Sequence, residues 1–153
     1  FAFGDAGAGR SEAMRRLAAR GLSGGGEGVD AGFVPDEIVA DGAAIEGDGW
    51  RLEALWTPGH FGNHLCFGWG DRWFTGDLAM GWSSSLISPP DGDVTQFMAS
   101  CERLAARLSP GRAQVLHAGH GAPVRDPSGR LAWLLRSGSS NWVWKGIMMS
   151  TSL

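Results

Sequence analysis

Three short turns in this 153-residue chain carry side chains that can bind a metal ion. His60 and His64 follow a Thr-Pro-Gly turn, Asp77 follows a Thr-Gly turn, and His120 stands between two glycines. Imidazole and carboxylate groups are the donors that proteins use to hold zinc and non-haem iron. Each residue alone is more simply explained as a turn cap or a hydrogen-bonding side chain. The three turns together, however, predict one metal site.

Each of these turns follows a stretch that is predicted to be a β-strand, so that rigid backbone would aim the ligands. Alternating apolar residues and a Gly-Asp turn indicate a strong strand and then a hairpin. A short apolar run further on would deliver His117 and His120. The expected strands are residues 50–57, 64–69, 72–75 and 114–116, with weaker candidates at 38–39 and 43–46.

The clearest helix is predicted to begin after Asp93, which can cap it, and to end before Pro110. Its apolar residues recur every three or four positions, as in a helix with one buried face. Strands and helices therefore alternate, which predicts an α/β domain with a mixed sheet flanked by helices. The remaining expected elements are a strand at residues 1–3, helices at 11–20 and 131–136, and a glycine-rich loop over 22–36.

The composition argues against several classes of function. A net charge of −3 leaves no general basic surface for nucleic acid or an anionic membrane. No apolar run reaches the roughly 20 residues that a membrane-spanning helix needs. Cys66 and Cys101 form no C-x-x-C pair, so we expect two buried thiols in a reducing cytoplasm. Nothing in the sequence indicates the oligomeric state.

The sequence divides into a domain over residues 1–136 and an atypical tail over residues 137–153. The tail is rich in Ser, Trp and Met and has no helical or strand periodicity. The chain opens directly on Phe1-Ala2-Phe3, an apolar strand-like run without a polar residue before it. We therefore expect the chain to be a fragment of a longer protein.

The three turns resemble motifs of the metallo-β-lactamase-fold hydrolase superfamily, in the branch that includes glyoxalase II-like enzymes. Residues 57–64 are similar to the motif T-P-G-H-T-x-G-H, residues 74–77 to F-T-G-D, and residues 119–121 to P-G-H-G, in the same order. The resemblance extends over residues 44–135. It implies an αββα sandwich, of which this chain would be the C-terminal portion.

The resemblance also implies two divalent metal ions, with Zn²⁺ as the first expectation and Fe or Mn as alternatives. His60 would bind the first metal, His120 would bind the second, and Asp77 would bridge both as the catalytic carboxylate. His64 and His117 would support these ligands without binding metal themselves. An activated water would then attack an ester, thioester, lactone, amide or phosphodiester bond of a small-molecule substrate.

The chain departs from the superfamily pattern in one major respect. The superfamily's first motif, H-x-H-x-D-H, is absent, and the four histidines all belong to the later motifs. Phe61 also stands where the motif has Thr, Asn63 replaces a variable small residue, and Ala118 replaces Pro. Two histidines and one aspartate hold a metal only weakly. We therefore expect the parent protein to be a metal-dependent hydrolase and this chain alone to be nearly inactive.

Two other functions remain open. The first is a non-enzymatic binding module that keeps the fold but has a degenerate metal site, with the Trp-rich tail as a partner contact. The second is nucleic-acid processing, since some members of the superfamily cut RNA. Scattered arginines at a negative net charge are more simply solvated surface residues; those that could form a basic flank are Arg103, Arg107, Arg112, Arg125 and Arg130.

Overall fold

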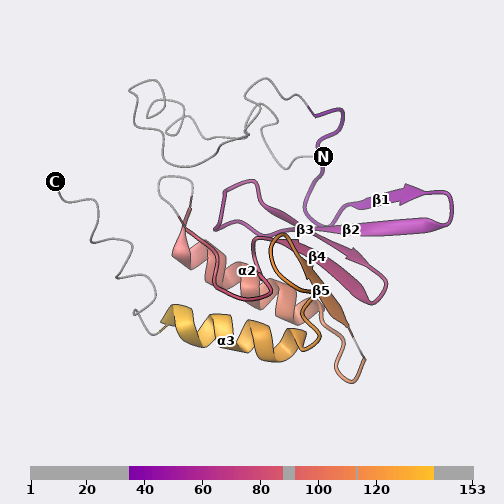
Figure 1. The fold of residues 1–153 in the computed structure, drawn as a ribbon. Coiled ribbons are helices and arrows are strands. Elements are labelled where there is room, and N and C mark those ends of the chain that lie inside the picture. Colours follow the sequence, from indigo (N-terminus) through magenta and orange to yellow (C-terminus); the bar gives the residue numbers. More distant parts are fainter. Residues whose placement is uncertain (1–34, 88–91, 113, 140–153) are drawn as a thin grey trace, which may run out of the picture.

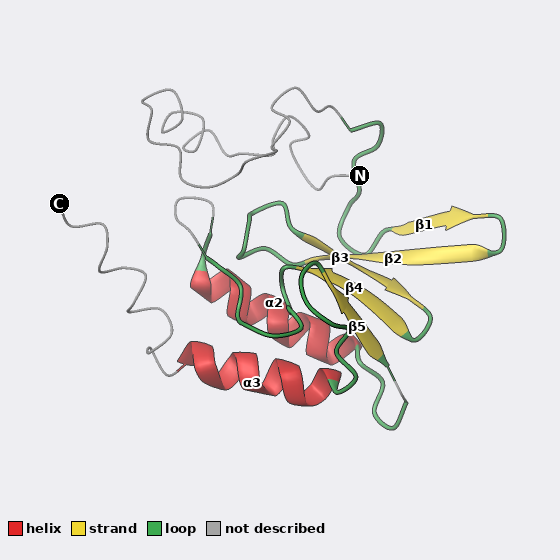
Figure 2. Ribbon diagram, viewed as in Figure 1, coloured by secondary structure: helices red, strands yellow, loops and turns green. Residues whose placement is uncertain are grey.

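The computed structural model describes residues 35–87, 92–112 and 114–139. The strand and helix expected within residues 1–20, most of the glycine-rich loop and residues 140–153 lie outside this part of the chain. The described residues form a five-stranded sheet and two helices, which Figures 1 and 2 show as two layers. This arrangement confirms the predicted α/β class with a mixed sheet.

The direction of the strands decides where the three turns meet. In the sheet, neighbouring strands are antiparallel except β4 and β5, which are parallel. Strands β2, β4 and β5 therefore run in the same direction, and their carboxyl ends reach the same edge. In spatial order the strands are β1 (Ala44–Gly47), β2 (Trp50–Trp56), β3 (Leu65–Trp69), β4 (Arg72–Gly76) and β5 (Val115–Ala118).

The local sequence explains the hairpins. Trp69 pairs with Arg72 across the turn, and Gly70 has φ = 60°, the left-handed conformation that a two-residue hairpin turn requires. The weaker strand candidate at residues 43–46 is confirmed as β1, which pairs with β2. The prediction for residues 114–116 ended too early, because parallel pairing with β4 continues β5 as far as Ala118.

Helix α2 (Val94–Arg107) begins where the sequence predicts. The Asp93 side chain accepts a hydrogen bond from the Gln96 N–H at 2.8 Å, which satisfies one of the free donors of the first turn. Its buried face carries Phe97, Cys101 and Leu104. The apolar periodicity therefore marks the face of the helix that packs in the core.

Helix α3 (Pro127–Ser139) is longer than the predicted segment at residues 131–136. Pro127 occupies its first position, where proline is well tolerated, and Asp126 accepts a hydrogen bond from the Gly129 N–H at 3.0 Å. The predicted start was late because Gly129 weakens the helical pattern of the first turn. The predicted boundary between residues 136 and 137 falls inside this helix.

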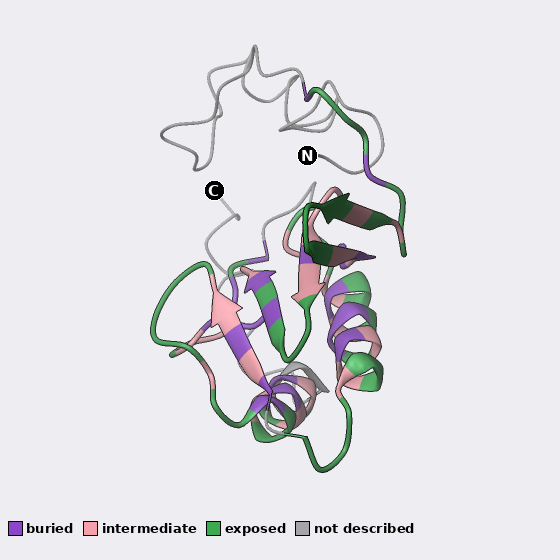
Figure 3. Ribbon diagram, turned by 90° about the vertical axis from the view of Figure 1, so that its right-hand side faces the viewer, coloured by how far each residue is buried: buried purple, intermediate pink, exposed green. Residues whose placement is uncertain are grey.

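The hydrophobic core lies between the sheet and the two helices, both of which cover the same face of the sheet (Figures 1 and 3). Cys66 of β3 and Cys101 of α2 are free, buried thiols within it. Burial raises the pKa of both thiols to about 12, so they stay protonated and pack as small apolar groups. The other core residues are Leu55, Trp73, Leu78, Ala79, Ile87, Phe97, Leu104, Leu116, Leu131 and Leu134.

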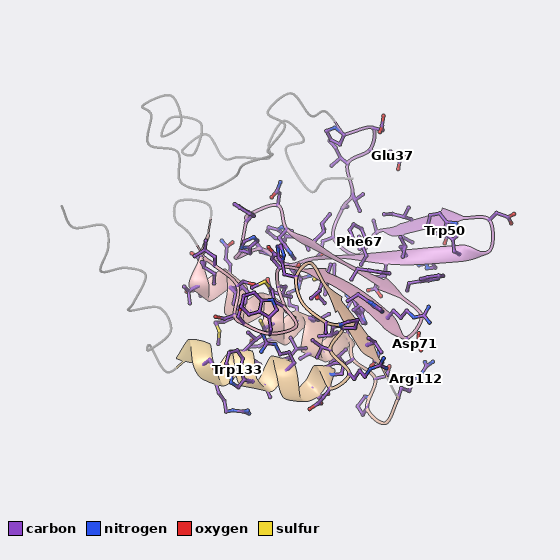
Figure 4. The ribbon with its side chains drawn as sticks, in the orientation of Figure 1. Glu37, Trp50, Phe67, Asp71, Arg112 and Trp133 are labelled. Atoms are coloured by element: carbon purple, nitrogen blue, oxygen red, sulfur yellow. The ribbon has the colours of Figure 1, made fainter. Side chains whose placement is uncertain are left out.

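The opposite face of the sheet is apolar and, among the described residues, has no helix over it. Trp50, Trp69 and Phe74 are 42%, 44% and 40% exposed, and with Leu52 they line a shallow apolar depression. Figure 4 labels Trp50 and Phe67 on the sheet, and Trp133 on α3 in the helix layer. A sheet with helices on one face and apolar residues on the other is the arrangement expected of half an αββα sandwich. The described helices include none that is long and apolar enough to span a membrane.

Candidate metal centre

The carboxyl-terminal ends of β2, β4 and β5 bring the three predicted turns together. His60 lies four residues beyond the end of β2, Asp77 directly follows β4, and His120 lies two residues beyond β5. His64 reaches the same edge from the start of β3, which is antiparallel to β2. The sheet therefore explains why residues 60 positions apart in sequence lie close in space.

Asp77 is the centre of this cluster. His60 Nε2 lies 3.3 Å from Asp77 Oδ2, and His120 Nε2 lies 3.6 Å from Asp77 Oδ1. The side chains of His60 and Asp77 are 15% and 25% exposed, whereas that of His120 is 65% exposed. The carboxylate thus has an imidazole nitrogen beside each of its two oxygens, and one side of the cluster is open to solvent.

A hydrogen bond to the backbone determines the tautomer of His60, and therefore which ring nitrogen has a lone pair. His60 Nδ1 lies 2.6 Å from the carbonyl oxygen of Leu86. A carbonyl can only accept, so Nδ1 carries the hydrogen, and in the neutral ring Nε2 has a lone pair. That lone pair faces Asp77 Oδ2, which is also an acceptor. Two acceptors at this distance repel each other, and a cation or a second ring proton between them removes the repulsion. The pair is therefore chemically suited to binding a metal ion.

His64 lies beneath Asp77, and both of its ring nitrogens have partners. Its Nε2 accepts the Asp77 N–H at 3.2 Å, so Nδ1 carries the hydrogen and donates to Thr57 Oγ1 at 2.8 Å. The Thr57 hydroxyl donates in turn to Cys66 Sγ at 3.3 Å. Desolvation of the ring, together with nearby His60, lowers the pKa of His64 to about 4. A neutral His64 therefore holds the Asp77 backbone.

Two glycines allow the backbone and these side chains to approach closely. A Cβ atom on Gly76, where φ is 48°, would lie 2.7 Å from His64 Nε2. A Cβ atom on Gly119 would lie 2.6 Å from Asp77 Oδ1. The Gly119 N–H also donates to the Gly76 carbonyl at 2.7 Å, which joins the Asp77 turn to the His120 turn. The absence of a side chain at Gly76 thus makes room for the His64 ring, and its absence at Gly119 makes room for the Asp77 carboxylate.

His117 is placed differently from the other three histidines. It lies within β5 beside Phe74, and the two rings are stacked with centroids 5.4 Å apart. Its carbonyl oxygen lies 3.5 Å from Thr75 Oγ1. Among the contacts of the described residues, its ring has none with His60, Asp77 or His120. Its predicted supporting role therefore has only this indirect backbone link to the Asp77 turn.

One part of the site could not be found by reading motifs. The Leu86 carbonyl orients His60, and the Gly81 N–H donates to the His120 carbonyl at 3.0 Å. Both groups belong to the backbone of the loop after Asp77. Backbone groups give almost no sequence signal, because every residue type supplies a C=O and every type except proline supplies an N–H.

The donor set suits a divalent metal but is incomplete in the part of the chain that the structure describes. There, no group of three or more His, Cys, Asp or Glu side chains is arranged to hold a metal ion as it stands. The geometry instead gives two imidazole–carboxylate pairs that share Asp77. Zinc in a catalytic site usually has three protein ligands. Each pair supplies two, so further donors are needed for a complete site.

Comparison with known sequences gives partial matches. The chain is 30% identical over 95 residues to an atrochrysone carboxyl ACP thioesterase of Claviceps purpurea, covering 61% of this chain and 28% of that protein. It is 31% identical over 90 residues to the lactamase-like protein aptB of Emericella nidulans, covering 58% of this chain and 26% of that protein. No family model matches the chain. The chain thus spans less than a third of the length of these curated relatives.

Comparison with solved structures gives a consistent fold. The metallo-beta-lactamase family protein TTHA1429 from Thermus thermophilus superposes with a TM-score of 0.62 at 27% identity, over 84% of this chain and 45% of that one. The protein TTHA1623, solved in a di-iron-bound form, superposes with a TM-score of 0.54 at 26% identity, over 82% of this chain and 55% of that one. Both matches extend beyond the three motif turns to most of the chain.

Proposed function

Because this chain has the metallo-β-lactamase fold, we propose that it carries part of the active site of a metal-dependent hydrolase. The observation that supports this function best is the Asp77 carboxylate with His60 on one oxygen and His120 on the other. His60, Asp77 and His120 would be the metal ligands. His64 would keep Asp77 in place through its backbone N–H.

A bound divalent metal would supply a nucleophilic water and polarise the bond to be cleaved. The chain's own residues prepare the site for this chemistry. Leu86 holds His60 with Nε2 toward Asp77, and His64 stays neutral because its ring is desolvated. The proposed metal is zinc, and the di-iron form of a structural neighbour supports iron as the alternative.

We propose a thioester with an apolar acyl group as the substrate class. The match to the thioesterase of Claviceps purpurea supports the bond type. Exposed apolar side chains around the cluster support the acyl group. The Phe61 ring lies 4.4 Å from that of His60, Leu86 contacts His60 through its carbonyl, and Trp82 lies against Gly121 beside His120. Phe61, Leu86 and Trp82 are 40%, 56% and 72% exposed.

The proposal has two further parts. Since the described residues offer only three candidate metal ligands, we propose that this chain alone turns over substrate slowly. We also propose a cytoplasmic location, because the free thiols of Cys66 and Cys101 suit a reducing compartment. The second candidate function is the non-enzymatic binding module, which is favoured by the incomplete ligand set in the described residues.

Hydrolysis of a benzoyl thioester by the Zn²⁺-loaded chain tests the proposed function. We expect a slow rate that requires metal, and we expect both EDTA and His60→Ala to reduce it to the rate of the metal-free chain. The matched control is Arg51→Ala, which removes a surface ion pair with Glu46 at the β1–β2 hairpin, far from the site. A metal-dependent rate that survives His60→Ala would contradict the assigned site. Metal binding without any turnover would favour the binding module.

A further inference from the structure

The loop over residues 80–87 contacts both imidazole-bearing turns of the site. Near its end, the Leu86 carbonyl accepts the hydrogen bond from His60 Nδ1 at 2.6 Å. Near its start, the Gly81 N–H donates to the His120 carbonyl at 3.0 Å. Gly81 packs so tightly that a Cβ atom there would lie 2.2 Å from the Ala122 carbonyl oxygen. The position of this loop therefore sets the orientation of one ligand ring and the placement of the other ligand's backbone.

The middle of the loop is bonded to helix α3. The guanidinium of Arg130 donates from Nη2 to the carbonyl oxygen of Ser83, 47 residues away in sequence. A charged donor makes a stronger hydrogen bond than a neutral one. The same guanidinium lies 4.6 Å from the centroid of the Trp133 ring, which is on the next turn of α3. The Arg130 side chain is thus held between α3 and the loop by two contacts.

The burial of Arg130 argues for a specific role. Its Nε atom is buried and has no hydrogen-bond partner among the residues that the structure describes. Burying a hydrogen-bond donor without a partner costs free energy. Another interaction must therefore keep the Arg130 side chain in this position. The contacts that it gains are the hydrogen bond to the Ser83 carbonyl and the cation–π contact with Trp133, and of these only the first reaches the loop.

We propose that Arg130 is a positioning residue for the candidate metal centre. It holds the loop over residues 80–87 in the conformation in which the Leu86 carbonyl orients His60 and the Gly81 N–H fixes the His120 turn. It touches neither ligand and acts through the backbone of the loop. The part of the test that measures metal binding rests on the proposed function. The effect of Arg130 on the His60 tautomer can be measured without metal.

The test compares Arg130→Met with Arg107→Met in the full chain. Methionine keeps most of the apolar stem of the arginine side chain and removes the guanidinium donors. Arg107 also joins a helix to the sheet layer, through Glu53 of β2, and within the part of the chain that the structure describes it makes no hydrogen bond or ion pair with the loop. Two quantities are measured: the fraction of His60 with hydrogen on Nδ1, from nitrogen NMR of the metal-free chain, and Zn²⁺ affinity by calorimetry.

For Arg130→Met we expect a mixture of His60 tautomers and an affinity for Zn²⁺ about 10-fold weaker, as for removal of outer hydrogen-bond partners of metal ligands. Arg107→Met is expected to leave both quantities unchanged, even if it lowers the melting temperature. Arg130→Lys, which keeps a charged donor, is expected to recover part of the loss. It also replaces Arg130→Met as the test variant if the Met variant does not fold.

An unchanged His60 tautomer in folded Arg130→Met would overturn the proposal, as would equal effects of the two arginine variants. If the unmodified chain binds no Zn²⁺, the proposed function fails, and the tautomer measurement still decides the role of Arg130. A change in the melting temperature alone would show only that Arg130 stabilises the fold, which is also a result against the proposal.

Discussion

Asp77→Asn is expected to remove Zn²⁺ binding while leaving the fold intact. Both His60 and His120 approach this carboxylate, so its replacement disrupts both imidazole–carboxylate pairs. An amide has the same shape but no negative charge. Since loss of an outer partner alone costs roughly 10- to 100-fold in affinity, we expect loss of this proposed central ligand to cost on the order of 100-fold or more.

The fold should tolerate this substitution for a specific reason. In the metal-free protein, the side-chain amide introduced by Asp77→Asn can donate a hydrogen bond to His60 Nε2, which relieves the contact between two acceptors. We therefore expect the melting temperature to stay the same or rise. The matched control is Asp71→Asn, which removes the same charge at the β3–β4 turn, at the other end of the sheet. Equal Zn²⁺ affinity in the two variants would contradict the assignment of Asp77.

Gly59→Ala is expected to cause the largest loss of stability among single-methyl additions near the site. Gly59 has φ = 134°, and an added Cβ atom would lie 2.3 Å from the backbone N and Cα of Phe97 in α2. The disfavoured backbone conformation and the overpacking against a helix cannot both be relieved locally. We expect the free energy of unfolding to fall by about 2–5 kcal/mol, from backbone strain and steric overlap together.

Gly62→Ala, in the same turn, is the matched control for this prediction. A Cβ atom on Gly62 meets nothing within 4 Å, and its φ is outside the left-handed range. Its substitution should change the free energy of unfolding by no more than about 0.5 kcal/mol. The measurement is urea denaturation of both variants. Similar losses in the two would show that the turn, and not the contact of Gly59 with α2, determines stability.

Local sequence patterns predicted the parts of the fold that depend on residues close together in the sequence. The Gly70 turn predicts the β3–β4 hairpin, and Asp93 with its apolar stripe predicts α2. The extension of β5 was missed because it depends on pairing with β4, about 40 residues earlier in the chain. The early start of α3 was missed because Gly129 hides the helical pattern. These failures reflect tertiary contacts that override local propensity.

The candidate site, too, has parts that the sequence predicts and parts that it does not. His60, Asp77 and His120 were predicted to lie together because each follows a strand and a glycine turn, and the structure places them together. The partners that orient them could not be predicted. Leu86 acts through its carbonyl, and Arg130 reaches the loop from a helix whose position only the fold determines. The grouping of the three side chains could be predicted from the sequence, but the contacts that hold them in place could not.

The most direct test of the site is the nitrogen NMR spectrum of the histidine rings during titration of the chain with Zn²⁺. The chain contains four histidines, so each ring can be assigned with the help of single substitutions. A metal ion that binds a ring nitrogen shifts the resonance of that atom. We expect the Nε2 signals of His60 and His120 to shift with Zn²⁺, and those of His64 and His117 to keep their metal-free pattern. Shifts confined to His117, or no shift at His60 at saturating Zn²⁺, would contradict a metal centre built on Asp77.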